Sequence, residues 1–409
     1  MNNPFTSKRF NDIWVKHFNG SRPYESLECI RHVSFVKNKF PKYFVNVGKN
    51  LTKGVYYELN SSATDFKGKT FLIYDVPSYF EVNPTSSGNS LKVKKVFQYK
   101  GFLMNLEGLK SSEEYIRSQF SSKNRREFRS NQRRLETCFN IRYTFYNKSI
   151  DKATFDVLFK QFHHLLSNRF AEKQTDYHHL ESQKWAYYSE LVFHMINEKR
   201  ASLLVIYKDE DPIGVTLNFH ADNILFETIT VFDPDYFKFS IGKTSIIKLL
   251  DWCFENKVTY SDFSKGDFKY KHKWGNLVYD FEYHILYDSK SIKAKFIAFL
   301  LERYFLTKLW LRKNHVNEWY RKFRFISKGG KRHNLDEHQP SIEKIAEVPE
   351  VSKLQKIDLR SEAHGFLKKY VYSFLFANPQ PEANVAIYKL PSEDTYFIQG
   401  SKKSQKITF

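Results

Sequence analysis

The sequence contains no long apolar run, and it has few cysteines. Among its 409 residues there is no stretch of about eighteen or more apolar residues, the length that a membrane-spanning helix needs. The start, from Met1 to Lys8, has no apolar signal-peptide core, so we expect a cytoplasmic protein. The three cysteines, Cys29, Cys138 and Cys253, are far apart in the chain. Their number and spacing predict neither a disulfide framework nor a metal cluster, and we expect no metal.

Aromatic residues and positive charge are abundant instead. The chain has 39 Phe and 26 Tyr, which is typical of packed domains and argues against disorder. The formal net charge is +20, a field that attracts phosphates, nucleotides, nucleic acid or an anionic membrane surface. The alternative is that the basic faces are simply solvated and bind no polyanion. The charge narrows the class of partner without identifying it.

The first part of the chain, residues 1–110, is predicted to be mixed α/β. Short apolar segments separated by Gly, Asn, Ser and Pro indicate strands at 33–36, 43–47, 71–74 and 93–99. A capping-box pattern, Ser111-x-x-Glu114, then begins a predicted helix over 111–138. Arg126, Arg129 and Arg133 are spaced to share one face of that helix.

A second α/β stretch follows two amphipathic helices at 155–170 and 183–198. Its strands are predicted at 202–207, 213–220, 223–232, 260–263 and 280–287, with a loop at 233–240 and a helix at 244–256. A strand–helix–strand order predicts a parallel strand pair. The expected domains are 1–110, 111–290, a basic helical extension at 291–335, and a tail or small accessory segment at 336–409 with one helical piece near 363–375.

The first candidate site is the loop and helix start from Phe239 to Thr244. A helix N-terminus offers free backbone N–H groups and a positive dipole end, which suit a phosphate or pyrophosphate. Gly242 allows close approach to the backbone, Ser240 and Thr244 add hydroxyls, and Lys243 adds charge. A P-loop is excluded, because Phe237 stands where that motif needs Gly. The alternative is an ordinary helix with Ser240 as its N-cap.

The second and third candidates lie on either side of that helix. The segment from Asp262 to Gly275 interleaves Lys269, Lys271 and Lys273 with aromatic residues, a pattern that can hold a flat or phosphorylated ligand if the chain is extended. The alternative is a Tyr/Trp anchor with solvated lysines. Glu227 stands among apolar strand residues, where a carboxylate can have a raised pKa and act as a general base. The alternative is a strand Glu that faces water.

From about Ser111 to Tyr287 the chain resembles the CelD/BcsL-type branch of the GNAT acyltransferases, the BioF2-like acetyltransferase domain. The pieces that carry this resemblance are the basic helix from Lys123 to Leu135, Arg169-Phe170, the hairpin around Pro212-Ile-Gly-Val215, the loop 233–242, and Gly266-x-x-x-Tyr-Lys-x-x-Trp-Gly275. The last motif is also similar to the signature of FemAB-type peptidyltransferases, which have two GNAT-like halves. The resemblance therefore implies an α/β (α+β) fold, with a GNAT-like mixed sheet flanked by helices, a first GNAT-like half in the N-terminal part, and a helical C-terminal extension.

The resemblance also implies roles for individual residues. The donor, acetyl-CoA or another acyl-CoA, is expected to place its pyrophosphate on Ser240, Ile241, Gly242, Lys243 and Thr244, although Phe239 and Thr244 depart from the usual GNAT pattern. Lys271 matches the lysine that stabilises charge at the reacting centre. The general base varies in this superfamily, and Glu227 and Asp262 are the candidates. The expected substrate-binding residues are Arg169, Tyr270 and Trp274.

Three hypotheses about function follow. The first is acyl transfer from acyl-CoA to an amine or hydroxyl of a sugar, nucleotide sugar or cell-envelope precursor, as in polysaccharide biosynthesis. The second is FemAB-type aminoacyl transfer from a charged tRNA, which the basic helix and the net charge favour. The third is a non-catalytic GNAT-derived scaffold of a polysaccharide synthesis complex, because fold alone does not establish activity. Peripheral contact with an anionic membrane fits the charge in each case.

Overall fold

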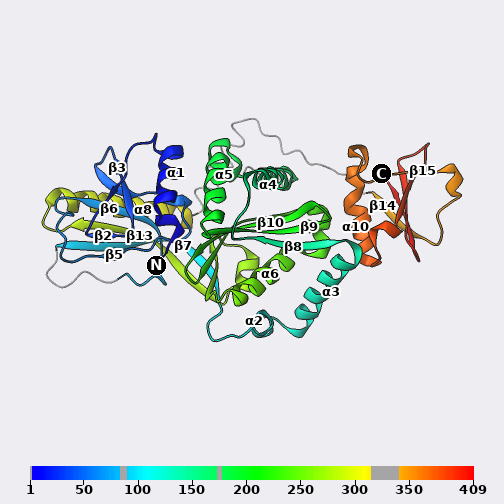
Figure 1. The fold of residues 1–409 in the computed structure, drawn as a ribbon, viewed down its shortest axis with the longest axis horizontal. Helices are drawn as coiled ribbons and strands as arrows, with labels where there is room; N and C mark the ends of the chain where they lie inside the picture. The colour runs from blue at the N-terminus through cyan, green and yellow to red at the C-terminus, as the bar shows by residue number, and fades with distance from the viewer. Residues whose placement is uncertain (1, 83–89, 173–176, 315–339) are drawn as a thin grey trace.

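The computed structural model describes residues 2–82, 90–172, 177–314 and 340–409. One sheet of eleven strands extends through the N-terminal and central parts, and a separate sheet of five strands forms the C-terminal part. Figure 1 shows these sheets side by side along the long axis, with the C-terminal strands at one end. The predicted mixed sheet flanked by helices is therefore confirmed.

The large sheet is built from strands of both predicted α/β stretches. In spatial order its strands are β1 (Glu25–Ser26), β3 (Ser34–Asn38), β4 (Tyr43–Asn46), β6 (Thr70–Pro77), β13 (Leu277–Asp288), β7 (Leu91–Asn105), β12 (Tyr260–Lys265), β11 (Ile224–Phe232), β10 (Asp211–Ala221), β9 (Ala201–Lys208) and β8 (Ile141–Tyr146). A small ladder pairs β2 (Ile30–Arg31) with β5 (Glu58–Leu59).

The same strand arrangement occurs twice in this sheet, and the two copies exchange one strand. In the first half β3 is antiparallel to β4, and β4 is parallel to β6. In the second half β10 is antiparallel to β11, and β11 is parallel to β12. The strand that follows β6 in sequence is β7, but β7 pairs with β12, and β13 pairs with β6. The long β7–β13 pair at the centre therefore joins the two halves.

Helices cover both faces of the sheet. One face is covered by α1 (Lys8–Phe18), α4 (Lys152–Glu172), α5 (Ser182–Asn197) and α8 (Ile292–Lys313). The other face of the second half carries α2 (Ser112–Gln119), α3 (Ser122–Cys138), α6 (Ile241–Glu255) and α7 (Lys269–Trp274). Strand β9 is buried on both sides. Leu203 and Val205 pack against the helices of the first face, while Leu204 packs against the helices of the other face. A strand with both faces covered is apolar at every position, in accord with the near-continuous apolar run over 202–207.

Two local predictions were wrong. The helix predicted over 111–138 is interrupted at Phe120, whose backbone is extended, and Ser121 then begins α3 by accepting a hydrogen bond from the Asn124 N–H. Phe120 turns inward there and packs against Phe128 and Trp274. The segment predicted as a loop before α6 forms a 3-10 helix, η4 (Pro234–Phe239), with Asp233 as its N-cap. Other short 3-10 helices are η1 (Pro4–Thr6), η2 (Lys49–Leu51), η3 (His178–Leu180), η5 (Val351–Lys353), η6 (Glu362–Leu367) and η7 (Glu382–Asn384).

The C-terminal part contains a sheet that the sequence did not predict. Besides the expected helical piece, seen as η6 and α10 (Lys368–Ala377), it has five strands. In spatial order these are β14 (Ser341–Ile345), β18 (Ser404–Thr408), β17 (Thr395–Gln399), β16 (Ala386–Lys389) and β15 (Gln355–Lys356). Helix α10 packs against α3 and η4 through a shared apolar core, in which Tyr372 contacts Phe139 and Tyr236. The C-terminal part is thus attached to the second half at the end where α6 begins.

None of the described helices is both long and apolar enough to cross a membrane. The three cysteines are free and buried, and each contributes to a hydrophobic core.

Candidate functional site

The parallel strands β11 and β12 pair only over a short stretch and then separate. Their last paired residues are Phe226 and Asp262, and Glu227 is the next residue of β11. The sequence predicted Glu227 and Asp262 as independent candidates, and the fold places them on neighbouring strands at the point of separation. Both carboxyl groups are buried: Glu227 is 8% exposed and Asp262 is 0% exposed. Two buried carboxyl groups at a strand opening are typical of a functional site.

Glu227 is a carboxyl group that favours its protonated form. Burial raises its pKa to about 8, because the charged form loses hydration there. The hydrogen bond that it accepts from the Ser261 Oγ, at 3.3 Å, and the charge of Lys271 act in the opposite direction. A carboxyl group with such a pKa exchanges its proton near neutral pH. That behaviour is required of a general base or acid.

Asp262 is held by hydrogen bonds from both halves of the sheet. Its Oδ2 accepts from the Tyr279 hydroxyl at 2.6 Å and from the Tyr79 hydroxyl at 2.8 Å, and its Oδ1 accepts from the Ser264 N–H at 2.6 Å. Burial raises its pKa to about 6, and the hydrogen bond from Tyr279 opposes that shift. With every oxygen bonded and its position fixed, Asp262 is suited to orienting neighbouring groups.

Lys271 is buried beneath the end of β12. The chain is not extended here, so the condition for alternating lysines and aromatic residues is not met: 269–274 forms helix α7, which places Lys271 and Trp274 one turn apart on the buried face. The Lys271 Nζ donates to three backbone carbonyls, those of Phe263 at 2.7 Å, Ser264 at 3.2 Å and Lys265 at 2.8 Å. Burial lowers its pKa to about 8, opposed by the charges of Asp262 and Glu227. Lys271 therefore fixes the irregular end of β12, in which Ser264 has a φ of 59°.

The remaining sequence-predicted substrate residues are dispersed. Trp274 is 3% exposed, stacks on Phe128 and packs edge-on against Phe120, so it is a core anchor of α7. Tyr270, on the other side of α7, is 44% exposed and lies close enough to Glu227 for their charges to interact. Arg169 of α4 stacks over the Phe232 ring at 4.8 Å, at the end of β11. The structure thus brings Tyr270 to the carboxyl pair and Arg169 to the far end of the same strand.

The predicted phosphate loop is the front of α6. Ser240 is the N-cap residue of the helix, as the alternative prediction had it, but its backbone is left-handed, with φ 57°, and its side chain makes no capping hydrogen bond. Its Oγ instead accepts a hydrogen bond from Asn131 of α3 at 3.2 Å. Lys243 forms an ion pair with Glu127 at 2.6 Å. Gly242 lies against Phe232: a Cβ at this position would be 2.9 Å from the ring.

The remaining residues of the loop complete this picture. Ile241 and Thr244 are buried in the body of the domain. The backbone amides of Ser240, Lys243 and Thr244 already donate, to the Phe237 and Ser240 carbonyls, so at this end of α6 the amides of Ile241 and Gly242 are the groups suited to bind an anion.

The first half contributes charged residues that sequence reasoning missed. Asp75 of β6 is fully buried, with a φ of 59°, and accepts from Thr52 Oγ1 at 2.7 Å and from Gln98 Nε2 at 2.8 Å. Asp75 also pairs with Lys265, the last residue of β12, at 3.1 Å. Lys53 keeps part of its side chain in solvent, yet its amine is densely surrounded. Burial lowers its pKa to about 7, and the charges of Lys265 and Lys271 lower it further.

We call Lys53, Asp75, Glu227, Asp262 and Lys271 the junction cluster. They interact electrostatically across the two halves: the charges of both Asp75 and Asp262 act on Lys53, and that of Lys271 acts on Lys53 and on Glu227. A weak signal for Asp75 existed in the sequence, as a carboxylate inside the apolar run Phe71-Leu-Ile-Tyr-Asp-Val-Pro77. Lys53 stands in a polar loop, and nothing in its neighbourhood distinguishes it.

Unpartnered polar atoms adjoin the junction cluster. In the described parts of the chain, the Ser264 hydroxyl and the His179 Nδ1 have no hydrogen-bond partner, although both residues are buried. Burial lowers the pKa of His179 to about 2, and the charge of Lys53 lowers it further, so His179 is a neutral ring. Buried polar groups without partners are uncommon and suit binding of a polar ligand. No group of three or more His, Cys, Asp or Glu side chains in the described residues is arranged to hold a metal ion.

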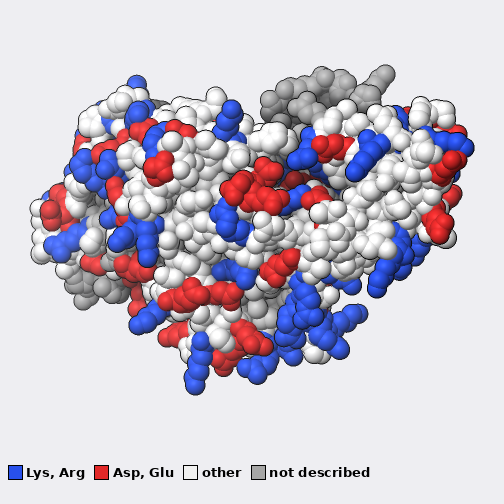
Figure 2. Space-filling view, turned by 45° about the vertical axis from the view of Figure 1, so that its right-hand side comes forward, with Lys and Arg blue, Asp and Glu red and all other residues white. Residues whose placement is uncertain are grey.

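A separate arginine-lined hollow lies between α3 and the C-terminal part. Its volume is about 370 Å³, and it is lined by Arg126, Arg129, Ser130, Arg133, Arg134, Thr137 and Pro379. Figure 2 shows Lys and Arg gathered at the lower right of that view, the side on which α3 lies. Arg134 is partly engaged, because it donates to the Phe376 carbonyl and stacks on that ring at 4.8 Å. The predicted shared face of Arg126, Arg129 and Arg133 thus forms one wall of this hollow.

Comparison with known proteins identifies part of the chain. Residues 122–272 match the family described as "Acetyltransferase (GNAT) domain". No curated protein matches the sequence. A solved structure of a conserved protein of unknown function from Bacteroides thetaiotaomicron VPI-5482 is similar at 10% identity and a TM-score of 0.43, over 70% of this chain and 92% of that one. A crystal structure of FemX has 10% identity and a TM-score of 0.44, over 68% and 91%. The structure described as L-PGS from Bacillus licheniformis has 10% identity and a TM-score of 0.37, over 66% and 85%.

The matched segment includes α3, the strands β8 to β12, α6 and most of α7, and so contains Glu227, Asp262 and Lys271. Residues 122–272 of the chain therefore form a domain of the GNAT acyltransferase superfamily.

Proposed function

We propose that the protein is an N-acyltransferase that moves an acyl group from acyl-CoA to an amine or hydroxyl bound at the junction cluster. The observation that carries the proposal is Glu227, a buried carboxyl group with a raised pKa at the point where β11 and β12 separate. The donor phosphates bind the amides at the front of α6, beside Gly242 and Phe232. The acceptor enters from the first half, where Lys53 and Asp75 lie.

The proposed chemistry uses Glu227 as the base. The acceptor amine attacks the thioester carbonyl, a C–N bond forms, the C–S bond breaks, and the amine proton passes to the Glu227 carboxylate. The thiolate of CoA leaves and takes up a proton. A base whose pKa lies near the working pH is deprotonated in a useful fraction of the molecules and still binds a proton strongly enough to take it from the amine. The attacking form is the neutral amine, so an acceptor that arrives as an ammonium first releases one proton to solvent.

Lys271 and Asp262 support the reacting centre in this proposal. The positive charge of Lys271 lies near Glu227, and a cation near the developing oxyanion stabilises the transition state more than the ground state. Its three hydrogen bonds to the 263–265 carbonyls also fix the turn that carries the free Ser264 hydroxyl. Asp262, bonded to Tyr79 and Tyr279, holds the two halves at the acceptor side.

The acceptor class that we propose is an amino sugar, a nucleotide sugar or a cell-envelope precursor, in the cytoplasm. The support is a pair of cations on the acceptor side, Lys53 of the first half and Lys265 of β12, which suits an acceptor that carries phosphate or carboxylate. Tyr270 is exposed beside Glu227 and offers an aromatic face to a sugar ring. Arg169, stacked on Phe232, is placed on the donor side and contacts the carrier in this proposal.

The test is direct. Purified protein is incubated with a panel of acyl-CoAs and amine acceptors, CoA release is followed, and CoA binding is measured by calorimetry. We expect binding of CoA and acceptor-dependent release of CoA, and we expect Glu227→Gln to lower the rate of that release by about 10²–10⁴. The matched control is Glu255→Gln, which removes an exposed carboxylate at the end of α6. Absence of both CoA binding and release contradicts the proposal. Unchanged in-cell function of Glu227→Gln and Lys271→Ala would favour the non-catalytic scaffold.

A second candidate is aminoacyl transfer from a charged tRNA, favoured by the arginine-lined hollow on α3. Phosphate contacts by several arginines give an affinity that falls steeply with salt. Arg126→Gln with Arg133→Gln is expected to weaken tRNA binding and reduce its salt dependence. Lys402→Gln with Lys403→Gln, in an exposed turn of the C-terminal part, is the control. A tRNA affinity that does not change between low and physiological salt contradicts this candidate.

A further inference from the structure

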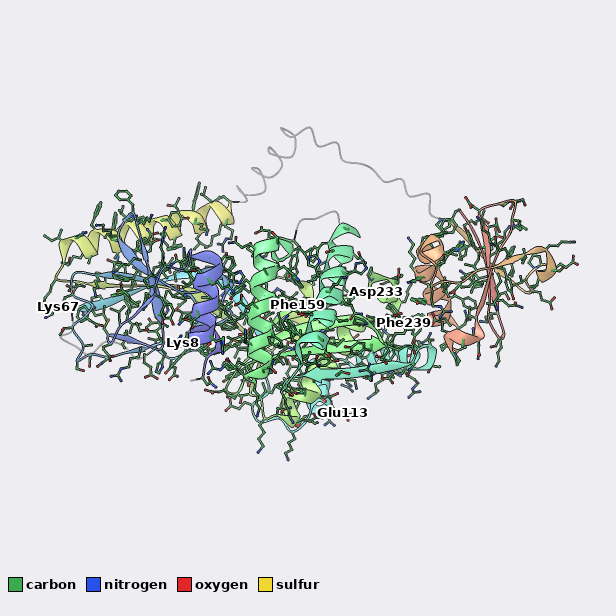
Figure 3. The ribbon with its side chains drawn as sticks, turned by 45° about the horizontal axis from the view of Figure 1, so that its top comes forward. Lys8, Lys67, Glu113, Phe159, Asp233 and Phe239 are labelled. Carbon is green, nitrogen blue, oxygen red and sulfur yellow. The ribbon has the colours of Figure 1, made fainter. Side chains whose placement is uncertain are left out.

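Helix α8 has two apolar faces, and only one of them packs against the protein. Its inner face buries Ala294, Ile297, Ala298, Leu301 and Phe305 over the large sheet. Phe305 stacks on Tyr283 of β13, with ring centroids 3.9 Å apart. These contacts fix the orientation of α8, so the opposite face points away from the sheet. Figure 3 shows α8, in yellow, along the outer edge of the first half with side chains projecting outward.

The outward face carries large apolar side chains at helical spacing. We call Ile292, Phe296, Phe299, Leu306 and Trp310 the outer stripe, because steps of three, four and seven residues keep them on one side of the helix. Ile292 is 84% exposed, and Phe296 and Trp310 are each 60% exposed. A continuous apolar patch of this kind marks an interaction surface, whereas single exposed apolar residues do not.

The charges around the outer stripe are almost all positive. Helix α8 has one acidic residue, Glu302, and its carboxylate pairs with Lys94 of β7 at 2.5 Å. The cations of the helix are Lys293, Lys295, Arg303, Lys308, Arg312 and Lys313. Arg303 lies within the outer stripe, with its guanidinium 5.3 Å from the Phe299 ring centroid. The exposed surface of α8 is therefore aromatic and cationic.

We propose that α8 docks the protein onto an anionic lipid bilayer, with the outer stripe inserted at the headgroup boundary and its cations on lipid phosphates. Aromatic and aliphatic side chains flanked by Lys and Arg are the composition of helices that lie in the membrane interface. With seven charged residues among its 22, α8 does not have the apolar length that spanning requires. A surface made for a protein partner needs no such bias toward one sign of charge, whereas anionic headgroups do favour it.

The docked helix ends beside the junction cluster. Arg312 donates to the Gln98 carbonyl at 2.6 Å, and the Gln98 side chain donates to Asp75 at 2.8 Å. Arg312 and Lys265 also share the Tyr99 ring, at 4.3 and 5.7 Å from its centroid. Lipid docking therefore brings the first-half side of the junction cluster toward the bilayer. The docking itself does not depend on the proposed reaction.

The test is sedimentation with vesicles of phosphatidylcholine alone and of equal parts phosphatidylcholine and phosphatidylglycerol. We expect the full chain to bind the anionic vesicles and to be released by salt. Phe296→Ser with Phe299→Ser and Trp310→Ser is expected to weaken binding by at least about tenfold, since these side chains supply the inserted apolar area. The matched control is Val157→Ser, which removes an exposed apolar side chain from α4.

A second set of variants tests the charge. Lys293→Gln with Arg303→Gln is expected to weaken anionic-vesicle binding by roughly fivefold for each cation removed, while Lys402→Gln with Lys403→Gln leaves it unchanged. Every substituted side chain is exposed, so circular dichroism should show unchanged folding. Lack of binding by the wild-type chain at low salt, or equal binding by the stripe variant, overturns the proposal. So does a shift from dimer to monomer in the stripe variant, which would assign the face to a second copy of the chain.

Insertion itself is tested by fluorescence quenching with brominated lipids. Trp310 is expected to be quenched, so Trp310→Phe should remove most of the lipid-dependent quenching while retaining vesicle binding. Quenching that is the same in wild type and Trp310→Phe means that another surface of the protein meets the lipid, and this also overturns the proposal.

Discussion

The two halves of the large sheet have the same strand order but different crossovers. Between β11 and β12 the second half has η4 and the fifteen-residue helix α6. Between β4 and β6 the first half has only the short elements η2 and β5 over residues 47–69, all of which the structure describes. A helix N-terminus is the part of such a unit that binds phosphate. From this difference we infer that the second half binds the acyl-CoA donor and the first half binds the acceptor.

The two halves also differ in the side chains that stabilise an equivalent bend in β6 and in β12. Each has a non-glycine residue with a φ of 59° where the strand after the crossover becomes irregular, Asp75 in β6 and Ser264 in β12. In the first half the bend is held by an ionic network of Asp75 with Lys265. In the second half it is held by Lys271, which donates to backbone carbonyls. Strained residues of this kind concentrate at functional sites.

The largest expected effect comes from the second half. Glu227→Gln should lower kcat by about 10²–10⁴, the usual contribution of a general base, with little change in either KM. Since the base acts only when deprotonated and burial raises its pKa to about 8, wild-type activity should fall as pH drops below about 8. This limb of the pH profile should be absent from the residual activity of Glu227→Gln. A full pH–rate profile of both proteins, with Glu255→Gln as control, checks it.

A smaller effect is expected from a substitution in the first half, and it should change the KM of the acceptor rather than kcat. Asp75→Asn removes the carboxylate that Lys265 and Lys53 face, and loss of one partner of a buried charge pair costs about 2–5 kcal/mol. We expect the KM of the acceptor to rise by on the order of 10–100-fold. Calorimetric affinity for CoA should not change, and Glu28→Gln, an exposed first-half carboxylate, should alter neither constant.

The same comparison can be made with a substitution that leaves the buried carboxylates in place. If Asp75→Asn fails to fold, Lys53→Met removes a partly exposed first-half cation and should again raise the acceptor KM alone. An effect of either variant on donor affinity rather than acceptor affinity would contradict the proposed division of work.

A substitution at the start of α6 should have the opposite pattern, with a change in CoA affinity and no change in the KM of the acceptor. In Gly242→Ala the new methyl group would lie 2.9 Å from the Phe232 ring, on which Arg169 stacks, so the ring must shift. Overpacking of this kind costs about 1–3 kcal/mol, and we expect CoA affinity to fall by roughly tenfold with the acceptor KM unchanged. Gly365→Ala, where a Cβ meets nothing within 4 Å, is the control. Calorimetry and steady-state kinetics separate the two constants.

The last expected effect is on stability. The pKa of Glu227 is about 8 in the folded protein and near 4.5 when exposed, so between these values the folded state holds a proton that the unfolded state has lost. This contribution of Glu227 is lost as pH rises through that window. Glu227→Gln does not ionise, so its free energy of unfolding should exceed that of wild type by more at pH 8 than at pH 5, by up to a few kcal/mol. Thermal unfolding at both pH values measures this, and an equal difference at both would contradict it.

The part of the fold that local pattern determines was predictable. The strand–helix–strand unit around α6 follows from apolar runs and a single Gly, and the strands of the first half were placed within a few residues. The break at Phe120 and the helix α7 were not predicted, because in both places burial of an aromatic side chain, Phe120 or Trp274, decides the backbone. The C-terminal sheet was not predicted, because its strands are short and carry polar residues, as in Ser404–Thr408, and so lack a clear apolar pattern.

The candidate site was predictable only on one side. Glu227, Asp262 and Lys271 lie within the part of the chain that resembles GNAT acyltransferases, so the sequence offered each of them as a candidate. Lys53, Asp75 and Tyr79 are more than a hundred residues away in the chain, and they reach the cluster because β13 and β7 are exchanged between the halves. Such pairing depends on long-range register, which a single sequence does not display.

The exchanged strands have a consequence for how the chain is made. When β7 leaves the ribosome, the strands that will flank it, β12 and β13, have not been synthesised, and β6 lacks its neighbour until residue 288 has emerged. A nascent fragment that ends before α6 therefore leaves β6, β7 and β11 without their neighbours in the middle of the sheet, and such unpaired edges are templates for aggregation. We therefore expect that halves divided at the sequence midpoint do not fold when they are expressed separately. The sheet of the N-terminal half is complete only after β12 and β13 have been synthesised.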